Sequence, residues 1–174
     1  MTVSGLQQFH IAIVTGDIQA AIDRYSRVLG VEGWSFWERM PPGSPMRVAY
    51  GHGAGATREL IGIEQEATSQ FHEFLKRHGE GVQHIGFWCP DLRGAVEEAL
   101  GAGGEIVSAT LDKQGNAVVQ VKPGDLDGLE LPRSLFITAG VGFTLEYFGP
   151  GSEQMYKDWF KEDYDAMLKP PPWA

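Results

Sequence analysis

Residues 83–92 read QHIGFWCPDL, and this stretch decides the fold because residues 9–18, FHIAIVTGDI, repeat it. In both copies an aspartate follows the histidine by seven residues, and Gly30 and Gly104 each lie twenty residues after their histidine. This regular correspondence indicates a tandem duplication. A duplicated unit that places a histidine on an equivalent strand in each half can bring two imidazoles together at a pseudo-twofold axis.

Each half follows an order of strand, helix and further strands. Residues 7–15 are rich in Ile and Val, which predicts a buried strand. Asp17 is positioned to cap a helix over residues 18–29, where apolar residues recur every three or four positions until Gly30. Residues 82–89 and 92–100 repeat this strand and helix. We also expect strands at 34–40, 46–50, 57–64, 106–111, 117–122, 134–139 and 143–148, and a short helix at 71–78.

The pattern predicts an α+β fold of two tandem βαβββ modules. We expect the first module at residues 1–69, a linking helix at 70–80, and the second module at 81–149 with an inserted hairpin and loop near 108–133. Residues 150–174 form a C-terminal tail whose apolar residues recur at helical spacing. This tail is expected to be helical, either docked on the core, closing the site or packing on a second subunit.

Glu59 and Glu146 stand at equivalent places in otherwise apolar strands. Burying a carboxylate without a partner is costly, so a cation, a metal ion or protonation has to compensate. The alternation of strand side chains puts each glutamate on the face that also carries His10 or His84. We therefore predict an apolar cup around two imidazoles and two carboxylates. Aromatic candidates for a substrate pocket, alternatively ordinary core residues, are Trp34, Phe36, Trp88 and Phe148.

The overall charge and the single cysteine limit the partners and the location. A formal net charge of −9 disfavours nucleic acid and anionic membrane surfaces as partners. The longest purely aliphatic run, residues 11–14, is too short for a secretory signal or a membrane span. Cys89 is the only cysteine, so it is expected to be a buried, unreactive thiol in a cytoplasmic protein.

The chain resembles the vicinal oxygen chelate superfamily, which includes glyoxalase I and methylmalonyl-CoA epimerase. The resemblance covers residues 7–149 and is strongest in residues 79–87, GEGVQHIGF, and residues 142–146, GFTLE. Around His84 the sequence is most similar to the epimerase branch. The family fold implies a cup-shaped mixed sheet around one divalent metal ion, held here by His10, Glu59, His84 and Glu146. Glu59 departs from the epimerase, which typically has glutamine, and is similar to bacterial glyoxalase I.

Two histidines and two glutamates in an octahedral frame leave two positions for water or substrate oxygens. These ligands suit Mn²⁺, Co²⁺, Ni²⁺, Fe²⁺ or Zn²⁺. Such an ion stabilises the enolate formed when a proton is removed next to a bound carbonyl, and a ligand carboxylate can take the proton. Glu146 is the preferred base, Glu59 is the other candidate, and Glu38 is the nearest acid for a second proton transfer.

Three classes of function follow. The first is a metal-dependent isomerase or epimerase acting on an acyl-CoA or another small carbonyl compound. The second is a lyase of the glyoxalase I type, favoured by Glu59. The third is a protein of the same fold that binds a small molecule without turnover. We expect a homodimer in each case.

Overall fold

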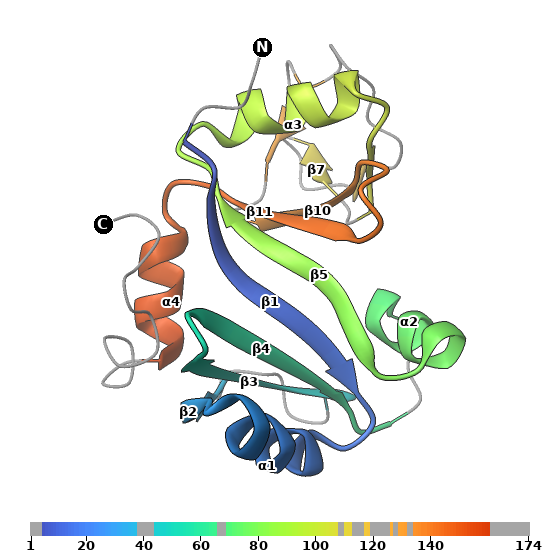
Figure 1. The fold of residues 1–174 in the computed structure, drawn as a ribbon. Coiled ribbons are helices and arrows are strands. Elements are labelled where there is room, and N and C mark those ends of the chain that lie inside the picture. The colour runs from blue at the N-terminus through green and yellow to red at the C-terminus, as the bar shows by residue number, and fades with distance from the viewer. Residues whose placement is uncertain are drawn as a thin grey trace. The chain divides into compact units, whose positions relative to one another are not determined.

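The structure, a computed structural model, divides into two compact units along the chain (Figure 1). It describes residues 5–37, 44–65, 69–107, 110–112, 117–118, 126, 129–131 and 134–160. One unit, called the N-terminal unit, contains Phe9–His84 and the described residues from Gln154 onward. The other, called the C-terminal unit, contains the described residues up to Gln8 and Ile85–Glu153.

The N-terminal unit begins with the predicted strand and capped helix. The Asp17 side chain accepts a hydrogen bond from the Ala20 backbone N–H at 3.0 Å, which satisfies a free donor of the first helical turn. The helix ends where Gly30 adopts a φ of 61°, a conformation that suits glycine. The elements of this unit are β1 (Gln7–Thr15), α1 (Ile18–Leu29), β2 (Glu32–Phe36), β3 (Met46–Gly53), β4 (Ala56–Ile63), α2 (Gln70–His78) and most of α4 (Ser152–Phe160).

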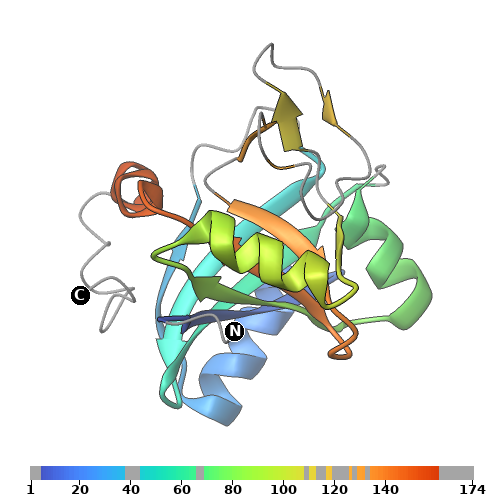
Figure 2. The same ribbon diagram turned by 90° about the horizontal axis from the view of Figure 1, so that it is seen from above.

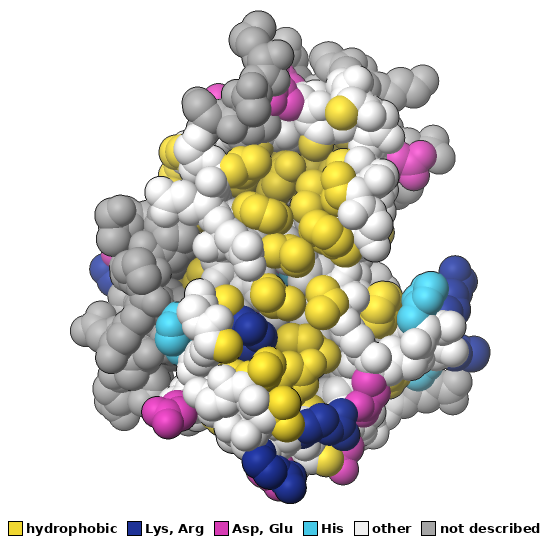
Figure 3. Space-filling model, viewed as in Figure 1, with side chains coloured by type: hydrophobic (Ala, Val, Ile, Leu, Met, Phe, Trp, Pro, Cys, Tyr) yellow, Lys and Arg dark blue, Asp and Glu magenta, His cyan; other side chains and the backbone are white. Residues whose placement is uncertain are grey.

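The strands of this unit pack one face against α1. Ile18, Ala21 and Ile22 of the helix form a core with Ile13 of β1 and with the strand residues Ala49 and Leu60. Burial of this apolar stripe supplies the main driving force for docking the helix. Charged side chains gather over α1 and α2 on the face shown in Figure 3. Because α1 covers one face of the strands, a buried polar site can lie on the other face of the strands.

A tight turn fixes the register of β3 and β4. Ala54 and Gly55 connect the strands with φ values of 49° and 73°. Two consecutive positive φ angles are typical of the type I′ turn, whose twist matches that of antiparallel strands. In the resulting register Tyr50 lies opposite Glu59. On its other edge β4 pairs in parallel with β1, and Glu59 is the partner of Ala12.

The C-terminal unit repeats the plan. The predicted cap forms, because Asp91 accepts a hydrogen bond from the Gly94 N–H at 3.0 Å. In this unit α3 lies over β10 and β11 (Figures 1 and 2) and packs with Leu135, Ile137 and Leu145. Its elements are the end of β5 (Gly81–Trp88), α3 (Leu92–Gly101), β6 (Glu105–Ile106), β7 (Thr110–Asp112), β8 (Ala117–Val118), β9 (Leu129–Glu130), β10 (Ser134–Thr138) and β11 (Thr144–Phe148).

The strand connections confirm the predicted α+β class with a mixed sheet. Hydrogen bonds link eight strands in the order β2-β3-β4-β1-β5-β11-β10-β6, and β7, β8 and β9 form a separate small sheet. This small sheet falls in the predicted insertion, part of which lies outside the described residues. The predicted tail begins with a helix, α4. Among the described residues, no helix has the length and apolar character needed to span a membrane.

Candidate metal centre

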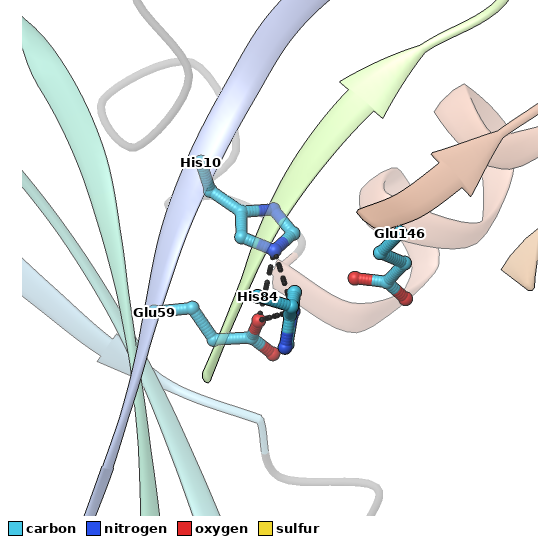
Figure 4. A group of neighbouring side chains, drawn as sticks. All are labelled: His10, Glu59, His84 and Glu146. Carbon is cyan, nitrogen blue, oxygen red and sulfur yellow. Dashed lines mark hydrogen bonds and ion pairs between the residues drawn. The ribbon is translucent and has the colours of Figure 1, made fainter. Parts of the chain in front are cut away.

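Three neighbouring strands bring His10, Glu59 and His84 together in the N-terminal unit. The side chains extend from β1, β4 and β5 and point toward one another (Figure 4). His10 is fully buried, His84 is 1% exposed and Glu59 is 7% exposed. Three of the four predicted ligands therefore converge in a site that water scarcely reaches.

The facing atoms of these side chains form a nearly equilateral triangle. His10 Nε2 lies 3.0 Å from His84 Nε2 and 3.0 Å from Glu59 Oε2. His84 Nε2 lies 3.1 Å from the same carboxylate oxygen. Each residue thus turns one ligand atom toward a common point. These residues belong to a group of side chains that could hold a metal ion.

The size of this triangle fits a six-coordinate metal ion. Ligand atoms about 2.1 Å from a metal and at right angles to one another are roughly 3.0 Å apart, whereas tetrahedral ligands are roughly 3.4 Å apart. The observed separations of 3.0 to 3.1 Å match the first arrangement. Two imidazoles and a carboxylate also form a donor set that suits Mn²⁺, Fe²⁺, Co²⁺, Ni²⁺ and Zn²⁺.

The electrostatics of the site favour a bound positive charge. Burial raises the pKa of the Glu59 carboxyl, but the attraction and hydrogen bonds of His10 and His84 outweigh this, and the pKa lies well below its ordinary value. Glu59 is therefore ionised at neutral pH. A buried carboxylate needs a compensating positive charge, which either a proton on an imidazole or a metal ion supplies.

Gln83 holds His84 in the tautomer that metal binding requires. The Gln83 side-chain oxygen lies 2.6 Å from His84 Nδ1. Because an amide oxygen only accepts, His84 Nδ1 carries the proton and donates. In the neutral imidazole this leaves the lone pair of Nε2 facing the triangle, as in many histidine metal ligands. The hydrogen bond from Nε2 to Glu59 belongs to the protonated imidazole, whose Nε2 proton a metal ion would replace.

Tyr50 performs a similar role for Glu59. Its hydroxyl donates a hydrogen bond to Glu59 Oε1 at 2.7 Å. Sequence reasoning missed both Tyr50 and Gln83. The hairpin register would have identified Tyr50 as the cross-strand partner of Glu59, and Gln83 is the immediate neighbour of a predicted ligand.

The remaining predicted site residues lie on other elements or outside the described residues. Glu146, the fourth side chain drawn in Figure 4, lies in the middle of β11 in the C-terminal unit and is 7% exposed. In the same unit Trp88 is half-buried at the end of β5 and Phe148 is 2% exposed. Glu38, the candidate second acid, lies outside the described residues.

Trp34 and Phe36 face α1 and are not brought to the histidines. Trp34 Nε1 donates a hydrogen bond to Ser26 Oγ of α1 at 2.8 Å. Both aromatic side chains pack on the core that contains Ile18 and Ile22. This packing fits the alternative that the sequence left open, namely ordinary core residues, and their role in a substrate pocket stays a prediction.

Several solved structures are similar to this chain. Methylmalonyl-CoA epimerase from Mycobacterium tuberculosis gives a TM-score of 0.60 at 19% identity, over 89% of this chain and 95% of that one. A hypothetical protein from Bacillus halodurans gives 0.58 at 16% identity, over 84% and 95% of the two chains. A variant of Streptomyces coelicolor methylmalonyl-CoA epimerase in complex with 2-nitronate-propionyl-CoA gives 0.57 at 18% identity, over 83% and 97%. At these identities the likeness establishes the fold alone.

The sequence itself identifies the family. No curated protein matches the chain. Residues 9–121 match the family model of the Glyoxalase/Bleomycin resistance protein/Dioxygenase superfamily, in agreement with the resemblance found in the sequence. Since this match covers more than half of the 174 residues, the chain belongs to the Glyoxalase/Bleomycin resistance protein/Dioxygenase superfamily.

Proposed function

We propose that the protein is a divalent-metal-dependent isomerase or epimerase that removes a proton from the carbon next to a substrate carbonyl. The observation that carries this proposal is the buried triangle of His10 Nε2, Glu59 Oε2 and His84 Nε2, with sides of 3.0 to 3.1 Å. Glu146 is proposed as the fourth ligand, because it is a buried carboxylate at the place in the second repeat that Glu59 occupies in the first.

A divalent ion held by this set would withdraw electron density from the carbonyl oxygen and stabilise the enolate. His10 and His84 would hold this ion, and the hydrogen bond to Gln83 keeps the proton of neutral His84 on Nδ1, away from the ion. The low-dielectric surroundings strengthen each of these electrostatic interactions.

Glu146 is the proposed base. Both oxygens of Glu59 are already engaged, Oε2 by the imidazoles and Oε1 by the Tyr50 hydroxyl, and the lowered pKa makes this carboxylate a weak proton acceptor. In the proposed step Glu146 takes the proton and the C–H electron pair enters the enolate. If the first carbon carries a hydroxyl group, return of that proton to the former carbonyl carbon completes an isomerisation, in which the hydroxyl proton passes to the former carbonyl oxygen and the first carbon becomes the new carbonyl. Epimerisation needs a second acid on the opposite face, for which Glu38 remains the candidate.

Acyl-CoA thioesters are the first substrate class to test, because one of the similar solved structures is an epimerase in complex with an acyl-CoA compound. A glyoxalase I-type lyase is the second candidate function, favoured by the carboxylate of Glu59 in the ligand triangle. The homodimer and the cytoplasmic location stay predictions from the sequence.

Two measurements, made one after the other, test the proposal. Metal analysis of tag-free protein is expected to give about one divalent transition metal ion per chain, lost in a His10→Ala, His84→Ala double variant and retained in His78→Ala, an exposed histidine on α2. If the wild type takes up none of Mn²⁺, Co²⁺, Ni²⁺ or Zn²⁺, the proposal is wrong and binding without turnover becomes the leading function.

The second measurement follows solvent deuterium exchange by NMR. The metal-loaded protein is expected to exchange the proton next to the carbonyl of its substrate, and Glu146→Gln is expected to abolish this exchange. Activity that requires glutathione and its hemithioacetals would instead identify the lyase.

A further inference from the structure

A buried pair of tyrosines lies behind the metal-facing carboxylate. Tyr50 is 3% exposed and donates to Glu59 Oε1 at 2.7 Å. The hydroxyl of Tyr156, which is fully buried on α4, lies 3.5 Å from that of Tyr50. Because the Tyr50 proton points to Glu59, the remaining direction for the second bond is from Tyr156 to Tyr50. Two hydroxyls therefore form a chain that ends on a proposed ligand.

The contact with Glu59 is the stronger of the two. A hydroxyl donating to a carboxylate at 2.7 Å, away from water, is a charge-assisted hydrogen bond. At 3.5 Å the bond between the tyrosines is at the long limit. The ring of Tyr156 also lies edge-on to Phe9 at 4.9 Å and to Tyr50 at 6.0 Å.

The two oxygens of Glu59 thus have separate tasks. Oε2 faces the imidazole nitrogens, and Oε1 is occupied by the hydroxyl of Tyr50. We propose that Tyr50, supported by Tyr156 of α4, is a positioning residue that keeps Glu59 a one-oxygen ligand. Without the hydroxyl, Oε1 would be free to turn toward the ion and occupy a coordination position that substrate needs.

This inference rests on the proposed metal site and adds a role for the C-terminal helix. The chain reaches α4 after the last strand of the C-terminal unit, yet Tyr156 packs on Phe9 and Tyr50 of the N-terminal unit. Forming α4 and completing the surroundings of Glu59 are therefore coupled. Loss of α4 would therefore loosen Tyr50, whose hydroxyl contacts the proposed ligand Glu59.

The test compares Tyr50→Phe, Tyr156→Phe and the matched control Tyr25→Phe, a tyrosine of α1 that packs against the core containing Ile18 and Ile22. Co²⁺ affinity is measured by competition with a chelator, and the visible absorption spectrum of bound Co²⁺ reports its coordination. Tyr50→Phe is expected to weaken Co²⁺ binding by about 10- to 100-fold, the usual effect of removing an outer hydrogen bond, and to alter the spectrum. Tyr156→Phe is expected to have a smaller effect, and Tyr25→Phe none.

Each result has a defined meaning. If wild type and Tyr50→Phe bind Co²⁺ within twofold of each other and give the same spectrum, the positioning role is wrong while the metal site stands. If wild type binds no Co²⁺, both proposals fall. If Tyr50→Phe also loses its folded circular dichroism, Tyr50→His, which retains a donor, decides: a native spectrum of bound Co²⁺ supports the role, and an altered one overturns it.

Discussion

Replacing Gln83 with leucine is predicted to weaken the metal centre and the fold together. The Gln83 oxygen is the acceptor for His84 Nδ1 at 2.6 Å, and these two residues are 6% and 1% exposed. Leucine has a similar volume but no acceptor, and water cannot readily take its place. The His84 N–H would lose its partner in a buried environment.

The magnitude follows from the cost of an unsatisfied buried donor, about 1 to 3 kcal/mol. For a chain of this length each kcal/mol lowers the unfolding temperature by roughly 2 to 4 °C, so the metal-free variant is expected to melt about 2 to 12 °C lower. Metal affinity is expected to fall about 10- to 100-fold, because the His84 tautomer with a free Nε2 is no longer enforced.

Calorimetry of the metal-free proteins and chelator competition with Zn²⁺ measure the two effects separately. Gln83→Glu is the informative control, since it keeps an acceptor for His84 and is expected to retain tight binding. Wild-type affinity in Gln83→Leu would refute the reasoning, because His84 would then adopt its ligand tautomer unaided. Equal losses in Gln83→Leu and Gln83→Glu would also refute it.

Three further predictions concern metal addition, acid stability and thiol reactivity. A divalent ion at 100 times its Kd is expected to stabilise the wild type by about 2.7 kcal/mol, which raises its unfolding temperature by roughly 5 to 11 °C, and to leave His10→Ala unchanged in a thermal shift assay. Hydrogen bonds from Thr15 at 2.6 Å and from Arg24 and the Gly16 N–H, opposed by slight burial, lower the pKa of Glu80. Because the pKa of Glu80 is lower in the folded protein than in the unfolded chain, the ionised carboxylate stabilises the fold above the ordinary pKa of glutamate. This stabilisation is lost as the pH falls through the pKa of the folded protein. Glu80→Gln should therefore be less stable at pH 7 by about 0.5 kcal/mol in urea unfolding, a difference that shrinks below pH 4.5. Burial raises the pKa of Cys89 to about 12, so its thiol is expected to react with a disulfide reagent at pH 8 only after unfolding, and rapid reaction of the folded protein would contradict this.

Local sequence signals predicted the elements that depend on local chemistry. The helix at residues 18–29 has the predicted bounds, because Asp17 supplies an acceptor for the first turn and Gly30 tolerates the positive φ that ends the last one. Asp91 likewise caps α3, which runs from Leu92 to Gly101, one residue beyond the predicted end at Leu100. The two histidines could be predicted from the sequence because the duplication places each of them at the same position of an equivalent strand.

The direction of the aromatic side chains on β2 could not be read from alternation alone. The pairing of β2 with β3 shifts between Glu32 and Ser35, and Gly33 between them has a φ of 63°. A bulge of this kind inserts a residue and resets which side chains face which side of the sheet. Ser35 consequently lies opposite Tyr50, and Phe36 lies opposite Ala49 in the core beneath α1.

The two proposed carboxylate ligands lie opposite different residues in their hairpins. In the first repeat the cross-strand partner of Glu59 is Tyr50, whose hydroxyl binds the rear oxygen of the carboxylate. In the second repeat the cross-strand partner of Glu146 is Phe136, which has no hydroxyl to donate. The two copies therefore carry different cross-strand partners opposite their carboxylates. A carboxylate held at both oxygens is suited to fixing an ion in one position. The engagement of both Glu59 oxygens is therefore the physical reason for giving Glu59 a structural role in the proposal, which leaves Glu146 as the base.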